Sequence, residues 1–342
     1  MNRYLRPMQK PLVSILIPFK NTEAYLSECL DSILQQTYSN WEVVIVNDHS
    51  TDRSNYIVKN YAEKDARIRL FQNKNSGIIE AMRIAFKNSN GIYITRMDSD
   101  DIMTPNRIET QCNSLEKSGK QHIAVGQVKY FAEGGVSDGF YKYEQWLNTL
   151  TSTAKNYSEI YKECVIPSPC WMVHREDLIA CNAFNPNRYP EDYDLTFRFY
   201  EQGLKCIPCN EILLHWRDYP VRTSRTHEHY AENHFLDLKL HYFLKLDYNN
   251  SRDLVVWGAG TKGKKAAQIL IEKRIIFVWI CDNPKKIGKH IYNQELKPFQ
   301  FLKTLNNPQS IVTVANQDAQ TYIKNYFYKL NKHSMVDYFF FC

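Results

Sequence analysis

Residues 13–18 read VSILIP and residues 41–47 read WEVVIVN, two short apolar runs that are rich in β-branched side chains. Runs of this length and composition predict strands that are buried on both faces of a parallel sheet. Between them, Leu26 to Leu34 carry apolar side chains at helical spacing, so an amphipathic helix is expected to connect the two strands. The beginning of the chain is therefore predicted to be a strand–helix–strand unit.

The same alternation continues over the first hundred residues. Further strands are predicted at residues 68–72 and 91–95, with a second amphipathic helix from Ile78 to Phe86 between them. This order predicts an α/β fold with a doubly wound, mostly parallel sheet, in which ligands bind beyond the carboxyl ends of the strands. The polar residues at those ends are candidates for a binding site, namely Asn21, Asp48, Asn73, Asn75 and Asp98.

A second, smaller α/β domain is predicted after the polar, turn-rich residues 247–253, which are typical of a linker. The expected domains are therefore residues 1–246 and 253–342. In the second, a predicted strand leads into GAGTKG at residues 258–263 and then into a helix, a pattern that resembles the nucleotide-binding half of Rossmann folds. Either NAD or another nucleotide binds there, or the domain serves packing or assembly. The residues in question are Gly258, Gly260, Gly263 and Asp282.

Composition and charge narrow the class of protein. The chain has 342 residues, of which 44% are hydrophobic and 23% charged, and no apolar run reaches the length of a membrane span. The apolar run near the N-terminus is too short for a signal peptide, so the nine cysteines are expected to be reduced and the location cytoplasmic. A net charge of +6 does not indicate a nucleic-acid surface. Basic clusters at residues 262–265 and 285–289 are either solvated faces or sites of peripheral contact with anionic lipid at the inner face of the membrane.

The sequence DSDD at residues 98–101 follows the predicted strand 91–95. Carboxylates two positions apart on extended chain point to the same side, so Asp98 and Asp100 can converge on one hard cation. Mg²⁺ or Mn²⁺ held in this way keeps coordination positions open for the phosphate oxygens of a diphosphate. The alternative is an acidic turn that caps the next helix. The position at the carboxyl end of a strand favours a metal site.

Five motifs occur in the order and at the spacing of one enzyme family: IPFKN (17–21), VNDHSTD (46–52), NSG (75–77), TRMDSDD (95–101) and PEDYDLTFR (190–198). Together they resemble the family 2 glycosyltransferases of the GT-A fold over about residues 10–230. The resemblance implies inverting, divalent-metal-dependent transfer of a sugar from a nucleotide-diphosphate donor, with a UDP-sugar expected. It implies donor contacts by Pro18, Asn21, Asp48, Asn75, Gly77 and Asp98, with Asp48 at the base, Asp98 at the ribose and Asp100 as the direct metal ligand.

The sequence departs from the family pattern at several of these positions. His49 stands where glycine is common, and Met82 and Arg83 stand where the family commonly has arginine and asparagine. Tyr219 replaces a histidine that often assists the metal or the phosphate. Candidates to substitute for that histidine are His215 and His227, and candidates to bind the diphosphate are Arg217 and Arg225, because guanidinium groups match phosphate oxygens.

Glu191 and Asp192 open a stretch with helical spacing that ends near Gly203. Inversion by direct displacement needs one group to take the proton of the acceptor hydroxyl, and the resemblance implies that Asp192 is this base, with Glu191 as its supporting partner. The alternative interpretation is two acids that the helix dipole favours at a helix N-terminus.

These patterns together predict a glycosyltransferase whose acceptor is a saccharide or lipid-linked saccharide in bacterial surface polysaccharide or lipopolysaccharide synthesis. One alternative is an NAD-dependent enzyme that modifies sugar nucleotides through the glycine motif of the second domain. The other is a non-catalytic module that binds nucleotide sugars, against which the complete set of Asp98, Asp100, Glu191 and Asp192 argues.

Overall fold

The structure is a computed structural model that describes residues 10–222 and 234–342. It divides these residues into two compact units. The first unit contains residues 10–156 and 166–222, and the second contains residues 157–165 together with residues 234–342.

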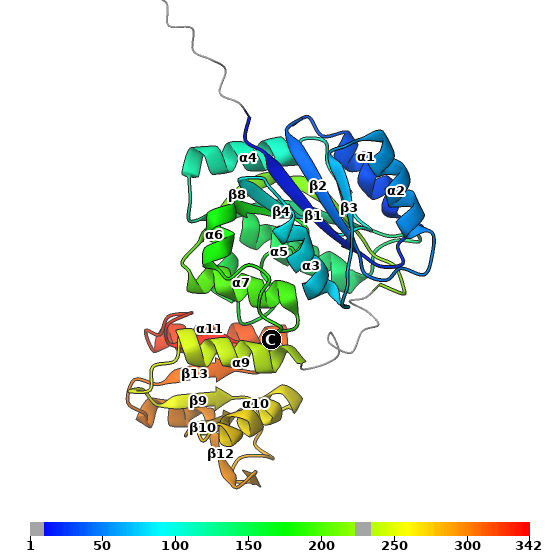
Figure 1. Ribbon diagram of the computed structural model, residues 1–342. Coiled ribbons are helices and arrows are strands. Elements are labelled where there is room, and N and C mark those ends of the chain that lie inside the picture. Colours follow the sequence, from blue (N-terminus) through cyan, green and yellow to red (C-terminus); the bar gives the residue numbers. More distant parts are fainter. Residues whose placement is uncertain (1–9, 223–233) are drawn as a thin grey trace, which may run out of the picture. The chain divides into compact units, whose positions relative to one another are not determined.

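The first unit is built on one twisted sheet with helices on both faces (Figure 1). Its strands lie in the order β3-β2-β1-β4-β7-β6-β8-β5, and β3, β2, β1 and β4 are mutually parallel, whereas β7 runs antiparallel to β4 and β6. The strands are β1 (Val13–Phe19), β2 (Trp41–Asn47), β3 (Ile68–Gln72), β4 (Tyr93–Arg96), β5 (Ile102–Met103), β6 (His122–Phe131), β7 (Trp171–His174) and β8 (Lys205–Arg217). The helices are α1 (Leu26–Leu34), α2 (Ser54–Lys64), α3 (Ile78–Lys87), α4 (Arg107–Ser118), α5 (Asp138–Ser152), α6 (Arg175–Ala180) and α7 (Glu191–Glu201).

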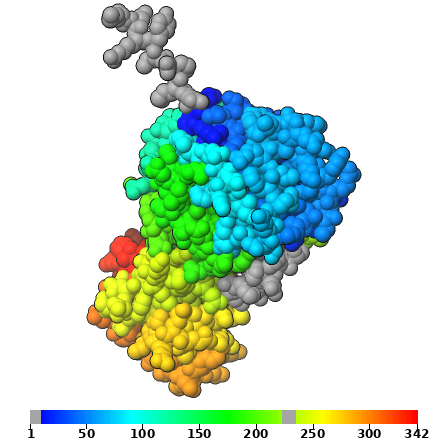
Figure 2. Space-filling view, in the orientation of Figure 1, coloured from blue at the N-terminus to red at the C-terminus, as the bar shows by residue number. Residues whose placement is uncertain are grey.

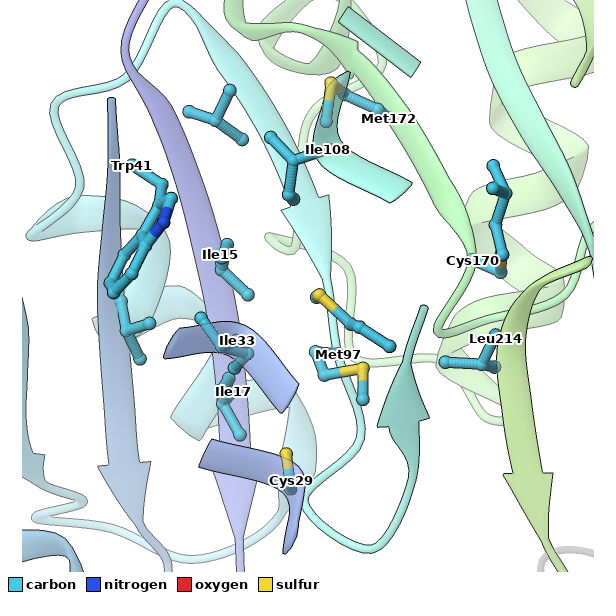
Figure 3. Packing of buried hydrophobic residues seen from close by; sticks show 14 of the residues in the cluster. Ile15, Ile17, Cys29, Ile33, Trp41, Met97, Ile108, Cys170, Met172 and Leu214 are labelled. Atoms are coloured by element: carbon cyan, nitrogen blue, oxygen red, sulfur yellow. The ribbon is translucent and has the colours of Figure 1, made fainter. Parts of the chain in front are cut away.

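Every residue of β1 and β2 is buried, which confirms the prediction from their continuous apolar runs. On one face, Ile15 and Ile17 pack in a cluster with Ile33 of α1 and Ile108 of α4 (Figure 3). On the other face lies Leu16, which is also fully buried. This burial fixes β1 and β2 as inner strands, so their carboxyl ends are held rigidly side by side.

The second unit is a smaller α/β structure with strand order β11-β12-β10-β9-β13-β14 (Figure 1). The five strands from β12 to β14 are parallel, and β11 forms an antiparallel edge. The strands are β9 (Leu254–Trp257), β10 (Val278–Cys281), β11 (His290–Ile291), β12 (Gln294–Pro298), β13 (Gln309–Val312) and β14 (Tyr338–Phe340). The helices are α9 (His234–Leu246), α10 (Thr261–Glu272) and α11 (Gln317–Lys329), with the 3₁₀ turn η3 (Phe299–Thr304). The parallel order with β9 at its centre is that of a Rossmann-like half.

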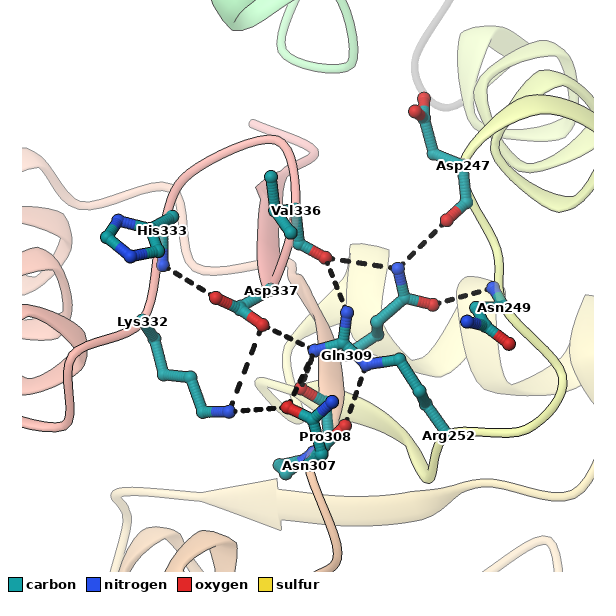
Figure 4. Close-up of polar contacts among 10 residues, drawn as sticks. All are labelled: Asp247, Asn249, Arg252, Asn307, Pro308, Gln309, Lys332, His333, Val336 and Asp337. Carbon is teal, nitrogen blue, oxygen red and sulfur yellow. Dashed lines mark hydrogen bonds and ion pairs between the residues drawn. The ribbon is translucent and has the colours of Figure 1, made fainter.

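The predicted linker, residues 247–253, is anchored within the second unit. Figure 4 shows the Gln309 side chain bonded to two residues of this segment. Its oxygen accepts from the backbone N–H of Asn249 at 2.7 Å, and its Nε2 donates to the carbonyl of Asp247 at 2.8 Å. In the same network Arg252 pairs with Asp337 at 2.5 Å. These side chains hold the segment in one conformation, so it does not act as a free tether.

The structure divides the chain elsewhere than at the predicted boundary of residue 246. Helix α9 and residues 157–165, which include most of the 3₁₀ turn η1 (Asn156–Glu159), belong to the second unit. The reason is an aromatic cluster: the Tyr161 ring stacks on Phe341 at 5.2 Å and meets Phe243 of α9 and Phe339 of β14 edge-on. A segment between α5 and β7 of the first unit is thus part of the core of the second.

Charge is distributed unequally between the two units. Residues 234–342 hold 16 Lys and Arg against 8 Asp and Glu, whereas the other 233 residues hold 27 against 29. The basic excess of the chain therefore lies in its C-terminal part, coloured yellow to red in Figure 2. Within residues 10–222 and 234–342, no helix combines the length and the apolar character needed to cross a membrane.

Candidate active site

Asp48 lies at the carboxyl end of β2 with its side chain buried and its oxygens already bonded. Asn73, which follows β3, donates from Nδ2 to Asp48 Oδ1 at 2.7 Å, and the backbone N–H of Gly77 donates to the two oxygens at 3.0 and 3.1 Å. The ammonium group of Lys20 stands 4.0 Å from Oδ2. The carboxylate is therefore held in one orientation by residues that follow two neighbouring strands.

Asn21 and Asn75 contact the loop that follows β2. The side-chain oxygen of Asn21 accepts from the backbone N–H of Thr51 at 2.7 Å, and the carbonyl of Asn75 is contacted by the His49 imidazole. His49 has a φ of 58°, in the left-handed region that favours glycine, which explains why glycine is common there in the family. Pro18 is buried within β1, opposite Val46 of β2. These three predicted residues lie at the same edge of the sheet as Asp48.

The acidic turn after β4 lies beside the end of β8. Asp100 and Asp101 are buried, and Asp98 is partly exposed. The hydroxyl of Tyr219 donates to Asp100 Oδ2 at 2.8 Å, and the backbone N–H of Arg217 donates to Asp101 at 2.8 Å. Burial raises the pKa of Asp100 and of Asp101, although the nearby Arg222 guanidinium opposes the rise. Positive charge near these acids, such as that of Arg222, favours their ionised form.

These residues fit a divalent cation whose coordination shell is completed by the phosphate oxygens of a nucleotide-sugar donor. Within residues 10–222 and 234–342 no cluster of three or more His, Cys, Asp and Glu forms a complete metal site. Mg²⁺ is usually bound by one or two carboxylates together with phosphate oxygens, and Asp98 and Asp100 offer that number. One carboxylate oxygen of Asp101 is buried with no hydrogen-bond donor among the described residues, so this turn has excess acceptor capacity.

Tyr219 occupies the predicted place of the family's histidine but acts on Asp100 as a hydrogen-bond donor. Burial and the Asp100 carboxylate raise the pKa of its phenol, so the hydroxyl keeps its proton. His215 pairs with Ile102 of β5, and burial lowers its pKa. His227 and Arg225 lie outside the described residues. The structure therefore offers no new residue for the histidine position among those that it describes.

Arg217, the other predicted diphosphate ligand, is engaged with protein groups. Its Nε donates to the carbonyl of Asp100 at 2.8 Å, and one terminal nitrogen pairs with Glu28 at 2.6 Å. Its guanidinium also lies over the rings of Tyr25 and Phe131, at 4.6 and 4.5 Å. Arg217 thus fixes the turn of the acidic residues through Nε and one terminal nitrogen.

Glu191 and Asp192 form the first turn of α7, and Arg96 connects this turn to the acidic residues after β4. The buried Arg96 guanidinium bonds Asp98 at 2.9 Å through Nε and Glu191 at 3.0 Å through a terminal nitrogen. Burial and the adjacent Glu191 raise the pKa of Asp192 to about 7, although Arg96 opposes the rise. A carboxylate with this pKa is a stronger base near neutral pH than an ordinary aspartate.

Sequence reasoning missed Arg96, Asp101 and Arg222. Arg96 is the one charged residue of the strand Tyr93–Arg96, and a buried guanidinium without an acidic partner is costly, so its position was a usable signal. Asp101 is the last residue of the DSDD motif, and its position in the motif predicted no separate role for it. Arg222 is buried beside the rings and acids at the end of β8, at 5.2 Å from the Trp216 ring, and no spacing in the sequence indicates this.

The glycine motif of the second unit lies where it was predicted, between β9 and α10. Gly258 has a φ of 123°, and a Cβ there would lie 2.6 Å from the Thr313 hydroxyl. A Cβ on Gly263 would lie 2.1 Å from the Gly258 carbonyl oxygen, whereas one on Gly260 would meet nothing within 4 Å. Asp282 accepts a bond from the Trp257 indole at 3.0 Å. Packing therefore requires glycine at two of the three positions, and the third, Gly260, faces open space.

Several known glycosyltransferases resemble this chain in sequence. The sequence model of glycosyl transferase family 2 matches residues 14–181. GlyG of Streptococcus pneumoniae is 37% identical over 230 residues, which are 63% of this chain and 73% of GlyG. GlyA of the same species is 30% identical over 214 residues, which are 60% of this chain and 30% of GlyA. The chain thus spans most of GlyG but less than a third of GlyA.

Solved structures resemble this chain in fold. TarS 1–349 of S. aureus in complex with UDP-GlcNAc superimposes with a TM-score of 0.52 at 18% identity, over 76% of this chain and 71% of that one. The mannosyltransferase PcManGT of Pyrobaculum calidifontis, in complex with GDP-Man and Mn²⁺, gives 0.51 at 19% identity, over 70% and 64%. At these identities the likeness concerns the fold, which is of the GT-A type. Because its sequence is related to GlyG over most of that protein and the fold agrees, the chain belongs to glycosyl transferase family 2 and is a glycosyltransferase.

Proposed function

We propose that this enzyme transfers a sugar, with inversion, from a UDP-sugar to a hydroxyl of a saccharide or lipid-linked saccharide, in a reaction that requires a divalent cation. The setting is the synthesis of bacterial surface polysaccharide or lipopolysaccharide, at the cytoplasmic face of the membrane. The biological setting rests on the resemblance to the family, whereas the chemistry rests on the residues at the carboxyl edge of the sheet.

The observation that carries the proposal is the position of Arg96 between two sets of acids. It bonds Asp98, beside the proposed metal ligand Asp100, at 2.9 Å, and Glu191, beside the proposed base Asp192, at 3.0 Å. The Arg96 side chain, bonded at both ends of its guanidinium, thus fixes the distance between the proposed positions of the leaving diphosphate and of the incoming hydroxyl. A direct displacement needs those two groups on opposite sides of one anomeric carbon, at a fixed separation.

In the proposed reaction Asp192 accepts the proton of the acceptor hydroxyl as its oxygen bonds to the anomeric carbon. The bond from that carbon to the donor oxygen breaks, and its electron pair leaves with the nucleoside diphosphate. When bound by Asp98 and Asp100, Mg²⁺ or Mn²⁺ supplies positive charge for the leaving diphosphate. Asp48, held by Asn73 and Gly77, orients the nucleobase of the donor. Arg217 holds the acidic turn in place.

Among solved structures of this fold, TarS supports a UDP-sugar as the donor, and PcManGT supports the cation but holds a GDP-sugar. TarS binds UDP-GlcNAc, and PcManGT binds GDP-Man with Mn²⁺. The residues that contact a nucleotide in this chain are proposals, because these structures share only the fold with it. In the second unit Gly258 and Gly263 have steric reasons to be glycine that a packing role and a nucleotide-binding turn share, so a test for bound NAD decides between these two roles.

A donor screen tests the proposal. Release of the nucleoside diphosphate is measured for UDP-, GDP- and dTDP-sugars with Mn²⁺, and again after chelation with EDTA. We expect release from a UDP-sugar that depends on the cation and that Asp192→Asn suppresses. Binding of a donor with no turnover on any acceptor tried would favour a non-catalytic module, and NAD carried by the purified protein would favour the sugar-nucleotide-modifying alternative.

A further inference from the structure

Arg83 of α3 stands where the family commonly has asparagine, and its side chain binds protein groups. Nε donates to the carbonyl of Phe184 at 2.9 Å, and a terminal nitrogen pairs with Glu80 at 3.0 Å. The other terminal nitrogen donates to the Asn187 side chain at 2.5 Å and to the carbonyl of Asn185. All three nitrogens of the guanidinium therefore have protein acceptors, and three of these four acceptors lie on residues 184–187.

Residues 184–187 lead directly into the proposed base. Tyr189 follows them, and Glu191 and Asp192 begin α7. The same loop is held from the other side by Arg198 of α7, which donates to the carbonyl of Ala183 at 2.6 Å. The conformation of this loop consequently sets where the first turn of α7 lies.

The loop also returns to the donor side of the site. A Cβ on Gly77 would stand 3.2 Å from the hydroxyl of Tyr189, so this hydroxyl lies against the glycine whose N–H holds Asp48. Helix α3 begins immediately after Gly77 and carries Arg83 on its second turn. The start of α3 is thus fixed beside Asp48 through Gly77. Its middle is fixed through Arg83 to residues 184–187, which precede the proposed base.

We propose that Arg83 and Tyr189 are positioning residues that set Glu191 and Asp192 relative to the bound donor. The inference rests on the proposed function, because it assumes that Asp192 is the base and that Asp48 orients the nucleotide. Arg83 acts by holding residues 184–187 on α3, and Tyr189 acts by limiting how closely the loop approaches Gly77. A displacement of about 1 Å between a base and its substrate can cost on the order of 10²-fold in rate, so such contacts act on kcat.

The decisive variants are Arg83→Met, which keeps the length of the side chain, and Arg83→Lys, which keeps the charge and one donor group. The matched control is Arg175→Met. Arg175 also holds a loop, donating to the carbonyl of Gly91 at 2.7 Å and to Ser89 at 2.8 Å, and its guanidinium lies over the Phe86 ring at 5.0 Å. Gly91 precedes β4, so this contact lies at the edge of the sheet away from the site.

Turnover is measured with the donor that the wild-type enzyme uses in the screen, and binding of the matching nucleoside diphosphate is measured by calorimetry with Mn²⁺. We expect Arg83→Met to lower kcat about tenfold or more and to change the donor KM and the nucleotide Kd less than about threefold. Arg83→Lys should restore part of kcat. Arg175→Met should lower the melting temperature at least as much as Arg83→Met and leave kcat unchanged.

Three results would overturn the role of Arg83. A tenfold rise in nucleotide Kd with kcat intact would make it a ligand of the donor. Equal loss of kcat in Arg175→Met would reduce the effect to general stability, and unchanged kinetics in Arg83→Met would remove the residue from the site. A wild-type enzyme that turns over no donor would instead be a failure of the proposed function, which the screen establishes before any variant is made.

Tyr189 has its own test. Gly77→Ala should lower kcat, because a methyl group there displaces the Tyr189 hydroxyl, and because alanine is strained at a φ of 97°. Adding Tyr189→Phe removes the hydroxyl and should recover part of that loss. A double variant no more active than Gly77→Ala alone would exclude the contact between residues 77 and 189 from the mechanism.

Discussion

Replacing Asp192 by Asn separates the stability of the fold from the chemistry of the site. The carboxyl group is placed at the first turn of α7, where burial and the neighbouring Glu191 raise its pKa to about 7. Such a group costs the folded protein free energy whenever it is ionised, because the unfolded chain ionises the same aspartate near pH 3.9. An asparagine has the same shape and carries no such cost.

The size and sign of the effect follow from these two pKa values. Between pH 3.9 and about 7 the folded protein binds more protons here than the unfolded chain, so the stability of the wild type falls as the pH rises through this range. The full difference between the folded and unfolded pKa of Asp192 corresponds to about 4 kcal/mol in the free energy of unfolding. Partial exposure of the side chain reduces this free energy to about 2 kcal/mol. Below pH 3.9 the two proteins should differ little, and above pH 7 the variant should be the more stable by this amount.

Thermal unfolding at pH 5 and pH 8 measures this difference. In a unit of about 200 residues, 2 kcal/mol raises the melting temperature by about 4 °C or more, so Asp192→Asn should melt later than the wild type at pH 8 and by a smaller margin at pH 5. Transfer should fall by roughly 10²-fold, the scale for loss of a general base, while the nucleotide Kd stays nearly constant. The wild-type kcat should rise with pH around an apparent pKa near 7.

Glu191→Gln is the companion variant, since it removes a neighbouring negative charge but not the proposed base. It should lower the pKa of Asp192, shift the rise of kcat to lower pH and reduce transfer less than Asp192→Asn does. A melting difference between wild type and Asp192→Asn that is the same at both pH values would refute the perturbed carboxyl group. Wild-type transfer by Asp192→Asn would assign the base elsewhere.

The remaining predictions concern the cation, the second unit and the membrane. Asp100→Asn should lose the Mn²⁺-stimulated release of nucleoside diphosphate, whereas Asp98→Asn should mainly weaken donor binding; stimulation that survives in Asp100→Asn would remove it from the ligand set. A chain that ends at Ser251 loses Phe339 and Phe341, exposes the rings of Tyr161 and Phe243 and should be recovered as insoluble protein, so a soluble product that binds donor would contradict the shared aromatic core. The intact protein should sediment with vesicles containing anionic lipid at low salt and be released by 0.5 M NaCl, because residues 234–342 carry twice as many basic as acidic residues. Equal binding to neutral vesicles would point to apolar contacts instead.

Local patterns predicted the elements that build the donor edge of the sheet. The runs at residues 13–18 and 41–47 predicted inner strands, because consecutive β-branched and apolar side chains point to both faces of a strand and must be covered on both. The helices α1 and α3 followed from apolar spacing, and the position of DSDD after a strand followed from the order of elements. Motif spacing also placed Glu191 and Asp192 at the start of a helix, where the structure has them.

What the sequence could not predict depends on residues that are distant in the chain. The bonds from Arg96 to Glu191 and from Tyr219 to Asp100 each join residues about a hundred positions apart, and no local spacing encodes them. The same is true of the division into units, where a Tyr161 ring between α5 and β7 packs with Phe341.

The sequence by itself determined which strands are inner and which polar residues stand at their ends, because hydrophobic periodicity is a local property of the chain. Only the tertiary structure decided what those residues do to one another. Burial and the charge of Glu191 raise the pKa of Asp192 to about 7, and these are properties of an assembled site whose low dielectric and neighbouring charges exist only after folding.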